Sequence, residues 1–467
     1  MRIGSRARRL RLNRSIILFA ALLACTTSAQ ETALRGSIAI TDVSIVDVEH
    51  GRSLAPRTVL IETGRITAIV APADARIPAQ AERIDGRGRF LIPGLVDMHV
   101  HLFNTYSKRP PNDWAFPMFL ANGVTGVREM SADAESMAVV RRWRREFDQG
   151  RPLAPRILAA GIAVRGETPA DATRAVDAAA DAGADFIKMF STVPAAQWRA
   201  IQGAARRRGL PVAGHVPVEI ALVDAAQAGQ RSGEHLTQAY EACTSIESAL
   251  IDERRGIRGE ALTAVRAAQD ARLFDAFDAK SCTRVGRALA RSGQAQVPTL
   301  VLPWHESTVA PEVSESDPRW PQLRADEQAR WRAALAEIAA TRDPYVLPRW
   351  QRSLAIVAAF QRAGVTLLAG TDAPMPRVYP GYSLHDELAL LVQAGMTPQQ
   401  ALHAATLAPA RFLGIEAISG TVAVGKRADL VLLEADPLRD IGNARRIRSV
   451  VIDGRLLRSV GAGPPGT

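Results

Sequence analysis

Runs in which apolar and polar residues alternate occupy both ends of the chain. These strand-like segments are residues 38–48, 58–71, 89–92, 422–437 and 448–457. Within the second of them, Glu62-Thr63-Gly64 predicts the turn of a β-hairpin. The pattern therefore predicts a small β-sandwich domain assembled from two separated parts of the chain, residues 30–92 and residues 419–467.

Between these parts, from residue 93 to residue 418, short apolar runs alternate with helical segments such as 170–182 and 194–208. Eight of the runs predict strands: 95–101, 123–130, 155–161, 185–190, 211–216, 231–236, 297–302 and 365–372. A later helix has clear boundaries, because Thr397 and Pro398 form its N-terminal cap and Gly414 ends the helical run. Strands that alternate with helices pair in parallel, so the fold class is α/β and the expected architecture is a (β/α)8 TIM barrel.

Two connections in this region are too long for a single βα unit. They join the sixth strand to the seventh and the seventh to the eighth, and each must contain additional helices. Insertions that follow the C-terminal ends of barrel strands shape the active site in this kind of fold.

Composition and charge exclude several classes of protein. With 47% hydrophobic and 23% charged residues, the chain is neither intrinsically disordered nor a polytopic membrane protein. The formal charge of +10 is concentrated near the N-terminus, where six arginines and no acidic residue lie within the first 29 residues. The remaining chain has no stretch that interleaves basic and aromatic residues, so we expect no nucleic-acid partner.

Residues 1–29 predict a signal peptide. A basic segment is followed by the apolar run SIILFAALLA at 15–24 and by the small residues Thr27-Ser28-Ala29. The apolar run is too short to span a bilayer as a helix. We therefore expect export to the periplasm or the medium. The alternative is a lipoprotein anchored at Cys25, since Leu22-Leu23-Ala24-Cys25 resembles a lipidation motif.

Residues of the types that bind metal ions fall at the ends of the predicted barrel strands. They are His99, His101, Lys188, His215, His235 and Asp372. Side chains alternate along a strand, so His99 and His101 share one face, and Asp97 lies on the same face. Each of these residues alone has an ordinary explanation in packing or turn formation. Because the C-terminal ends of barrel strands converge on one cavity, their coincidence favours a shared metal site.

These motifs resemble those of a known family. His99 and His101 lie in PGLVDMHVH, Lys188 in FIKMF, His215 in AGH, His235 in GEH and Asp372 in AGTDAP. Together with the tail HDELALLVQAGMTPQQALHAATLAPARFLG and ISGTVAVGKRADLVLL, they are similar to the binuclear metal-dependent amidohydrolase superfamily, and within it to the imidazolonepropionase-like and Xaa-Pro-dipeptidase-like branch. The resemblance extends over residues 37–454. It implies the same barrel and split sandwich that the strand pattern predicts.

The resemblance also implies a site with two divalent metal ions, for which zinc is the best match to histidine and oxygen ligands. His99 and His101 would bind the more buried ion together with Asp372. His215 and His235 would bind the second ion. Lys188, carbamylated by carbon dioxide, would bridge both, because a lysine carbamate is an anionic oxygen ligand whereas an ammonium repels cations.

The implied reaction is hydrolysis of an amide bond in a small substrate such as a dipeptide, an N-acyl amino acid or a cyclic amide. A metal-activated bridging hydroxide would attack the carbonyl carbon, with Asp372 as the general base and then the general acid. A lactone or carbamate ester hydrolase and a catalytically silent binding or scaffold relative remain alternatives. Deamination is disfavoured because deaminases of the superfamily carry His-x-x-Glu, whereas here Glu219 is the fourth residue after His215.

Several further residues have weaker or different expectations. For His385 and His403, on the last helices, packing is favoured over catalysis, and Tyr240 and Trp304 either line a pocket or pack in loops. Arg128-Glu129 stands where relatives have Arg-Asp, without a role that the sequence reveals. Cys243 and Cys282 both lie in the first long insertion. In an oxidising compartment they are expected to form a disulfide, with two buried thiols as the alternative.

Overall fold

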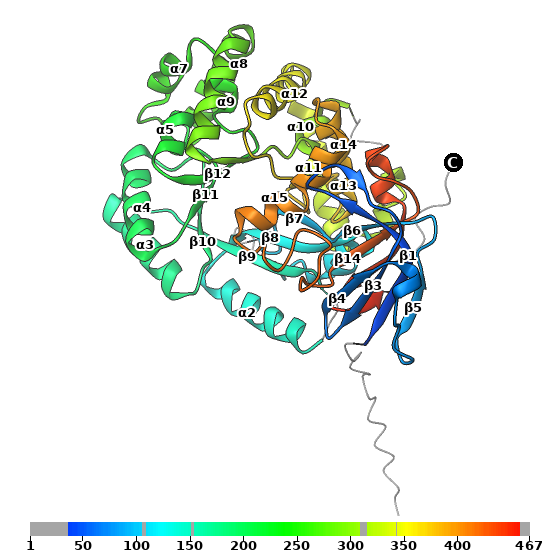
Figure 1. The fold of residues 1–467 in the computed structure, drawn as a ribbon. Helices are drawn as coiled ribbons and strands as arrows, with labels where there is room; N and C mark the ends of the chain where they lie inside the picture. The colour runs from blue at the N-terminus through cyan, green and yellow to red at the C-terminus, as the bar shows by residue number, and fades with distance from the viewer. Residues whose placement is uncertain (1–35, 105–108, 151–153, 309–314, 342, 458–467) are drawn as a thin grey trace, which may run out of the picture. The chain divides into compact units, whose positions relative to one another are not determined.

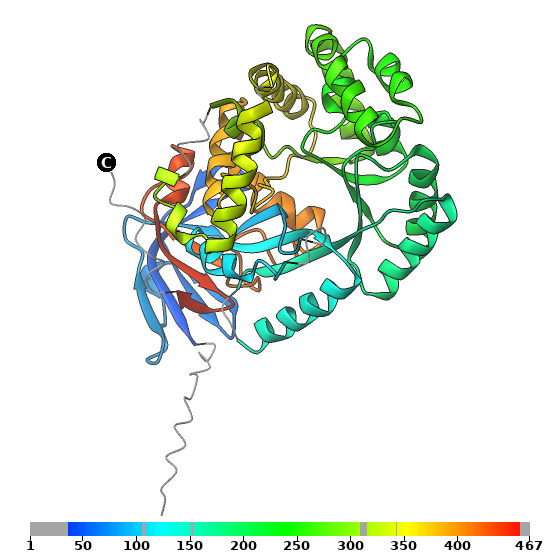
Figure 2. The same cartoon turned by 180° about the vertical axis from the view of Figure 1, so that it is seen from behind.

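Seven parallel strands form the wall of a barrel in the computed structural model, which describes residues 36–104, 109–150, 154–308, 315–341 and 343–457 (Figures 1 and 2). In spatial order they are β7 (Leu95–Val100), β8 (Val124–Ala132), β9 (Arg156–Ala163), β10 (Phe186–Met189), β11 (Val212–Gly214), β12 (Gln230–Glu234) and β13 (Ala295–Val297). Strands β7 and β10 are buried along their whole length, as expected for strands that are covered on both faces.

The eighth barrel segment closes the gap between β13 and β7 without forming a regular strand. On one side, Gln296 of β13 donates its backbone N–H to the Thr366 carbonyl at 2.9 Å. On the other side, Met98 of β7 donates to the Ala369 carbonyl at 2.9 Å, and the Asp372 N–H donates to the His99 carbonyl at 2.7 Å. The (β/α)8 prediction is therefore confirmed, but the eighth segment, expected as a strand at 365–372, pairs with its neighbours only through isolated bridges at Leu367 and Ala373.

The seventh strand also differs from its prediction. It was expected at 297–302, but β13 ends at Val297. Proline has no backbone N–H, so Pro298 cannot continue the ladder as a donor, and Thr299 takes a left-handed conformation with φ of 47°. Helix α10 then begins at Val301.

Helices cover the outside of the barrel and fill its long connections. They are α1 (Phe116–Ala121), α2 (Ala134–Asp148), α3 (Pro169–Asp181), α4 (Ala195–Arg208), α5 (Leu222–Gln227), α6 (Ala239–Ala242), α7 (Glu247–Arg254), α8 (Gly259–Asp275), α9 (Ala279–Ser292), α10 (Val301–Thr308), α11 (Ala325–Thr341), α12 (Val346–Arg362), α13 (Tyr382–Gln393), α14 (Pro398–Ala404) and α15 (Leu407–Phe412). The predicted N-cap is confirmed, because Thr397 forms a capping box with Gln400 at the start of α14. The two long connections contain α6 to α9 and α10 to α12, as expected.

A second, nine-stranded sheet joins the two ends of the chain. Its strands are β1 (Ile38–Asp47), β2 (Arg52–Ser53), β3 (Arg57–Glu62), β4 (Arg65–Val70), β5 (Glu82–Asp85), β6 (Phe90–Pro93), β14 (Leu430–Leu433), β15 (Ile447–Ile452) and β16 (Arg455–Leu457). Strand β6 pairs with β14, which brings the two ends together. The predicted hairpin is present, with Thr63 and Gly64 both at positive φ between β3 and β4, as in the tight turns that match strand twist.

The first half of β1 pairs with β3 and β5, and its second half pairs with β6. Between the halves Asp42 has φ of 53°, so the strand bends. Side chains from the N-terminal and the C-terminal strands of this sheet, such as Ile40 and Leu432, share one apolar core. This arrangement agrees with the predicted sandwich, whereas the domain boundaries stay predictions.

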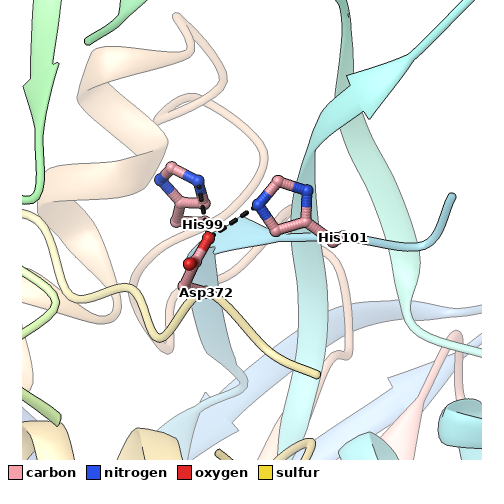
Figure 3. A group of neighbouring side chains, drawn as sticks. All are labelled: His99, His101 and Asp372. Atoms are coloured by element: carbon pink, nitrogen blue, oxygen red, sulfur yellow. Dashed lines mark hydrogen bonds and ion pairs between the residues drawn. The ribbon is translucent and has the colours of Figure 1, made fainter. Parts of the chain in front are cut away.

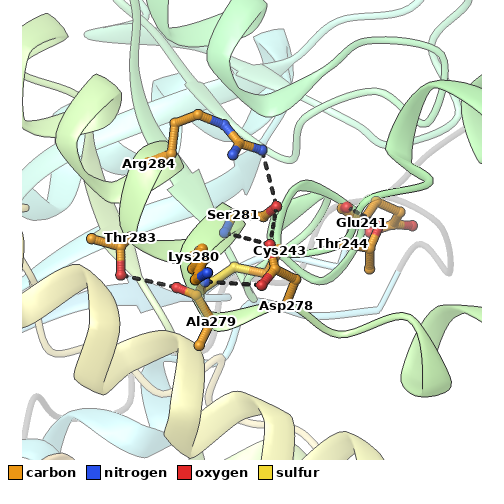
Figure 4. The surroundings of a disulfide bond; sticks show 10 residues. Glu241, Cys243, Thr244, Asp278, Ala279, Lys280, Ser281, Thr283 and Arg284 are labelled. Atoms are coloured by element: carbon orange, nitrogen blue, oxygen red, sulfur yellow. Dashed lines mark hydrogen bonds between the residues drawn. A yellow bond between two sulfur atoms is a disulfide. The ribbon is translucent and has the colours of Figure 1, made fainter.

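A disulfide joins Cys243, at the end of α6, to Cys282 in α9 (Figure 4). Both sulfur-bearing residues are fully buried. The expected pairing is thus confirmed. The bond links α6 to α9, the first and the last of the four helices in this long connection. Cys25 and the predicted signal peptide lie outside the described residues. Within the described ranges, no helix is both long enough and apolar enough to cross a membrane.

Candidate metal centre

His99 in β7 and His101, the residue directly after β7, lie next to Asp372 where the eighth segment closes the barrel (Figure 3). The Asp372 Oδ1 atom lies 2.6 Å from His101 Nε2 and 3.1 Å from His99 Nε2. One ligand atom from each residue lies within 4.8 Å of the other two. The period-two spacing of His-x-His places both rings on the same side of the strand, as predicted.

The other two predicted histidines continue this cluster. The His235 ring centroid lies 4.4 Å from that of His99 and 5.0 Å from that of His215. His235 Nε2 is 4.0 Å from Asp372 Oδ1. Four imidazoles at the C-terminal ends of β7, β11 and β12 are therefore neighbours, although these three strand ends are far apart in the sequence.

Lys188 ends inside the same site. Its side chain is fully buried, and its Nζ atom has no hydrogen-bond partner among the described residues. Burial lowers the pKa of Lys188 to about 8, and Arg128 adds to this effect, while Glu234 and Asp372 oppose it. A substantial fraction of the amine is therefore neutral near pH 7 to 8, which is the form that reacts with carbon dioxide.

Backbone turns at the strand ends direct these side chains. His235 and Asp372 have positive φ angles of 58° and 70°, in a region that side-chain-bearing residues rarely adopt. At His235 the turn interrupts the alternation of β12, so Glu234 and His235 both reach the site although they are adjacent. Such strained backbone conformations are concentrated at functional sites.

Glu234 is a functional residue that sequence reasoning missed. Its Oε2 atom lies 2.9 Å from His99 Nδ1, and Arg128 binds both of its carboxylate oxygens at 2.9 and 3.0 Å. Arg128 also donates to the Met98 carbonyl at 2.6 Å. Burial opposes ionisation of Glu234, but Arg128 and His99 outweigh it and hold the pKa of this carboxyl far below its usual range. The only signal in the sequence was its place beside His235.

The carboxylate of Glu129, the second residue of the Arg128-Glu129 pair, accepts hydrogen bonds from the backbone. Glu129 accepts hydrogen bonds from the Leu102 and Ser131 N–H groups, and Ser131 Oγ lies 2.7 Å from His101 Nδ1. Burial raises the pKa of Glu129 to about 6. Arg128 thus supports His99 through Glu234, and Glu129 supports His101 through Ser131. These contacts explain a motif to which the sequence alone assigns no role.

Asp97 supports the site through hydrogen bonds to the residues next to the candidate ligands. It shares the face of His99, as predicted, but it accepts hydrogen bonds from the Thr371 hydroxyl at 2.6 Å and from the Thr371 and His99 N–H groups. It therefore ties β7 to the segment that carries Asp372. Burial raises its pKa to about 7, despite these hydrogen bonds.

The electrostatics of the cluster suit metal binding. Burial would raise the pKa of Asp372, but His101, His235 and His99 outweigh it and hold this pKa well below the usual range. Burial also lowers the pKa of His99, of His235 to about 3, and of His215 to well below its ordinary value. These three rings are therefore neutral near pH 7. Neutral imidazoles and an ionised carboxylate are the protonation states in which such groups bind divalent cations.

A cavity of about 540 Å³ opens onto the cluster. Lys188, His215, His235 and Asp372 line it, together with apolar side chains such as Phe190. A second cavity of about 410 Å³ shares His235 with the first and is lined by Tyr240 and Phe274. Tyr240 therefore does line a pocket, and its hydroxyl lies 2.8 Å from Ser353 Oγ.

The remaining candidates lie elsewhere. Glu219 accepts hydrogen bonds from the Ala195 and Gly256 N–H groups, both at 2.8 Å, and from Arg258, so it serves as a structural acceptor. His385 is buried, with Nε2 3.0 Å from the Asn122 carbonyl oxygen, which agrees with the packing role expected for it.

His403 lies half-buried in α14, also in agreement with the packing expectation. Trp304 packs against the main apolar core and its ring lies 4.7 Å from that of His305. The structure therefore assigns Trp304 to packing.

The sequence profile of the Amidohydrolase family matches residues 90–268 and 351–457, which together make up more than half of the chain. A curated relative, deacetylase Atu3266 of Agrobacterium fabrum, is 37% identical over 75 residues, which are 16% of this chain and 18% of that protein. The match therefore spans less than a fifth of that relative's length.

Solved structures resemble nearly the whole chain. A Xaa-Pro dipeptidase is 20% identical with a TM-score of 0.63, covering 91% of this chain and 100% of that one. Bottromycin amidohydrolase is 24% identical with a TM-score of 0.67, covering 90% and 87%. Molinate hydrolase is 19% identical with a TM-score of 0.62, covering 92% and 98%. At these identities the likeness concerns the fold.

Proposed function

This chain belongs to the amidohydrolase family, and from that premise we propose that it is an exported metal-dependent hydrolase of amide bonds in small substrates. Dipeptides, N-acyl amino acids and cyclic amides are the substrate classes. The observation that carries the proposal is that four histidines, Asp372 and the buried amine of Lys188 form one cluster, and that all of them except the fully buried His99 line one cavity.

The donor set fits two divalent metal ions, preferably zinc. His99, His101 and Asp372 already hold their ligand atoms close enough together to bind one ion. His215 and His235 would hold the second. The unpartnered Nζ of Lys188 supports carbamylation, since a buried amine without a hydrogen-bond partner is costly, and a carbamate would bind both ions as a bridging ligand.

When bound, the metal ions would lower the pKa of a water molecule and polarise the scissile carbonyl. Asp372 would accept the proton of the attacking water and then deliver it to the leaving nitrogen. Its carboxylate can accept a proton because the pKa of Asp372 lies well below the usual range, so the group is ionised near pH 7. Glu234 and Ser131 would hold His99 and His101 in orientation through their Nδ1 atoms.

Two experiments test this function. Metal analysis of the purified enzyme should give about two divalent ions per chain, whereas none after expression in metal-supplemented medium would favour a binding or scaffold protein. A library of dipeptides, N-acyl amino acids, cyclic amides, lactones and carbamate esters should show its highest kcat/KM on amides. Preferred cleavage of lactones or carbamates would replace the amide assignment by the alternative one.

The disulfide supports export, because structural disulfides persist in oxidising compartments. Fractionation of the producing cells should locate the protein in the periplasm or the medium, with mass spectrometry showing loss of residues 1–29. A lipid on Cys25 in the membrane fraction would establish the lipoprotein alternative. Recovery of the full-length chain from the cytoplasm would refute export.

A further inference from the structure

Two arginines line the cavity that holds the candidate metal ligands, and both bind the same carboxylate. Arg109 Nη1 lies 2.9 Å from Glu327 Oε2, and Arg330 Nε lies 3.0 Å from Glu327 Oε1. The Glu327 side chain is fully buried, whereas the side chains of Arg109 and Arg330 are 23% and 27% exposed. Two guanidinium groups share one carboxylate, so these three side chains carry one net positive charge at the cavity wall.

The surrounding structure fixes this charge in position. Glu327 also accepts a hydrogen bond from Trp331 Nε1 at 3.0 Å, and Trp331 is fully buried. Arg330 Nη2 donates to the Pro374 carbonyl at 3.0 Å, two residues beyond Asp372. Helix α11, which carries Glu327 and Arg330, is thereby connected to the loop that follows the catalytic aspartate. A guanidinium held in this way loses little freedom when it binds a further anion.

The rest of the cavity wall favours an anion that carries an apolar body. The apolar lining consists of Phe103, Phe190, Leu302, Pro374 and Met375. Among the described residues that line the cavity, Asp372 is the only acidic one. An ammonium group entering this cavity would find only Asp372, which three imidazoles already surround. A carboxylate would meet the guanidinium donors of Arg109 and Arg330, whose shared partner Glu327 is fully buried and does not line the cavity.

We propose that Arg330, together with Arg109, binds the free carboxylate of the substrate and makes it a specificity determinant. The substrate would then be an amide whose leaving amine is an apolar amino acid, as in N-acyl amino acids and dipeptides. Neutral amides, lactones and carbamates would be poor substrates. This inference rests on the proposed amide hydrolysis and narrows its substrate class.

The test compares N-acetyl-L-leucine with N-acetyl-L-leucinamide, which differ only in the charged group. Acetate release is measured for both, so hydrolysis of the terminal carboxamide does not interfere. In the metal-loaded wild-type enzyme, kcat/KM should be higher for the acid. Arg330→Met should lower kcat/KM for the acid by about 10- to 100-fold, the loss expected for one charge-assisted hydrogen-bonding partner, and for the amide by less than about threefold.

A matched control on the same helix is Arg332→Met, since Arg332 pairs with Glu315 at the surface and is absent from the cavity lining. It should leave both values unchanged. Because the acid-to-amide ratio is taken within one preparation, it does not depend on how much Arg330→Met enzyme folds. If that variant is insoluble, Arg109→Gln replaces it, with the same ratio as the readout.

Equal losses for both compounds, or no loss for the acid, would overturn the inference while leaving amide hydrolysis intact. If the wild-type enzyme releases acetate from neither compound, binding calorimetry with the same pair decides. Tighter binding of the acid that disappears in Arg330→Met supports the carboxylate site even if the proposed reaction fails. Equal affinity for acid and amide overturns it.

Discussion

The Nδ1 atom of His99 lies 2.9 Å from Oε2 of Glu234, and neither side chain has any exposed surface. A carboxylate in this position fixes which ring nitrogen carries the proton, so it leaves His99 Nε2 available on the side that faces Asp372. Arg128 completes the arrangement, because it forms an ion pair with Glu234 and so balances its charge. The orientation of a candidate metal ligand is thus determined by two buried residues that do not line the cavity.

We expect Glu234→Gln to weaken metal binding without unfolding the protein. The amide keeps the size of the side chain but loses the charge that fixes His99, and such supporting residues typically contribute 10- to 100-fold to metal affinity. Chelator competition followed by metal analysis measures the change. Glu253→Gln, at an exposed glutamate, is the control. Unaltered metal affinity in Glu234→Gln would show that the contact with His99 is only structural.

Asp372→Asn should abolish turnover and retain metal. Asparagine cannot accept the proton of the attacking water, and loss of general base catalysis costs about 10²- to 10⁴-fold in kcat. Steady-state kinetics on the best amide from the library, with metal content measured on the same sample, provides the check. Near wild-type kcat would remove Asp372 from the role of proton acceptor.

Lys188→Ala should lose most activity and regain part of it when formate or propionate is added. A small carboxylate would take the place of the missing carbamate. The surface variant Lys280→Ala is the matched control and should behave as the wild type. Mass spectrometry of the native wild-type enzyme prepared with bicarbonate should detect carbon dioxide bound to Lys188. An unmodified amine in metal-loaded enzyme would refute the carbamate.

Removing the disulfide should destabilise the helical connection. The bond closes a loop with a sequence separation of 39, for which the chain-entropy relation gives about 4 kcal/mol. Denaturant unfolding of a Cys243→Ser, Cys282→Ser double variant measures the loss. Thiol titration of the unfolded, unreduced protein should detect neither cysteine, and both should react after reduction. Two reactive thiols from these positions before reduction would contradict the pairing.

Glu387 should make the protein less stable as the pH rises. Burial raises the pKa of this carboxyl from 4.5 to about 8, although the Leu300 and Val301 N–H groups oppose the shift. Between about pH 5 and pH 8 the folded state retains a proton that the unfolded state has lost, so folding stability falls across this interval by an amount on the order of a few kcal/mol.

Glu387→Gln removes that titration and keeps an oxygen that can accept from Val301, which now donates to Glu387 Oε2 at 3.0 Å. The variant should therefore gain stability relative to the wild type at pH 8 but not at pH 5. Denaturant midpoints at both pH values measure the effect. A parallel pH dependence in the two proteins would exclude Glu387 as its source.

Local patterns in the sequence predicted most elements of the fold. The capping box at Thr397, the hairpin turn at Gly64 and the helices near 170–182 and 194–208 each depend on preferences that act within a few residues. The six metal-binding candidates were recognisable because strand ends of a barrel must converge, and the structure gathers their side chains in one cluster, five of them lining one cavity. The cysteine pair was predictable because few alternatives exist among three cysteines.

Only the tertiary structure decided which residues support that cavity. Glu234 lies against His99 across 135 positions of sequence, and Arg109 shares Glu327 with Arg330 across 218. The eighth barrel segment is also held by hydrogen bonds to β13 and β7 instead of by its own strand geometry. Periodicity reports which face of a strand or helix a side chain occupies. A buried charged group needs a partner of opposite charge, and that partner can lie far away in the sequence. Periodicity does not identify it, so only the folded structure shows which residue it is.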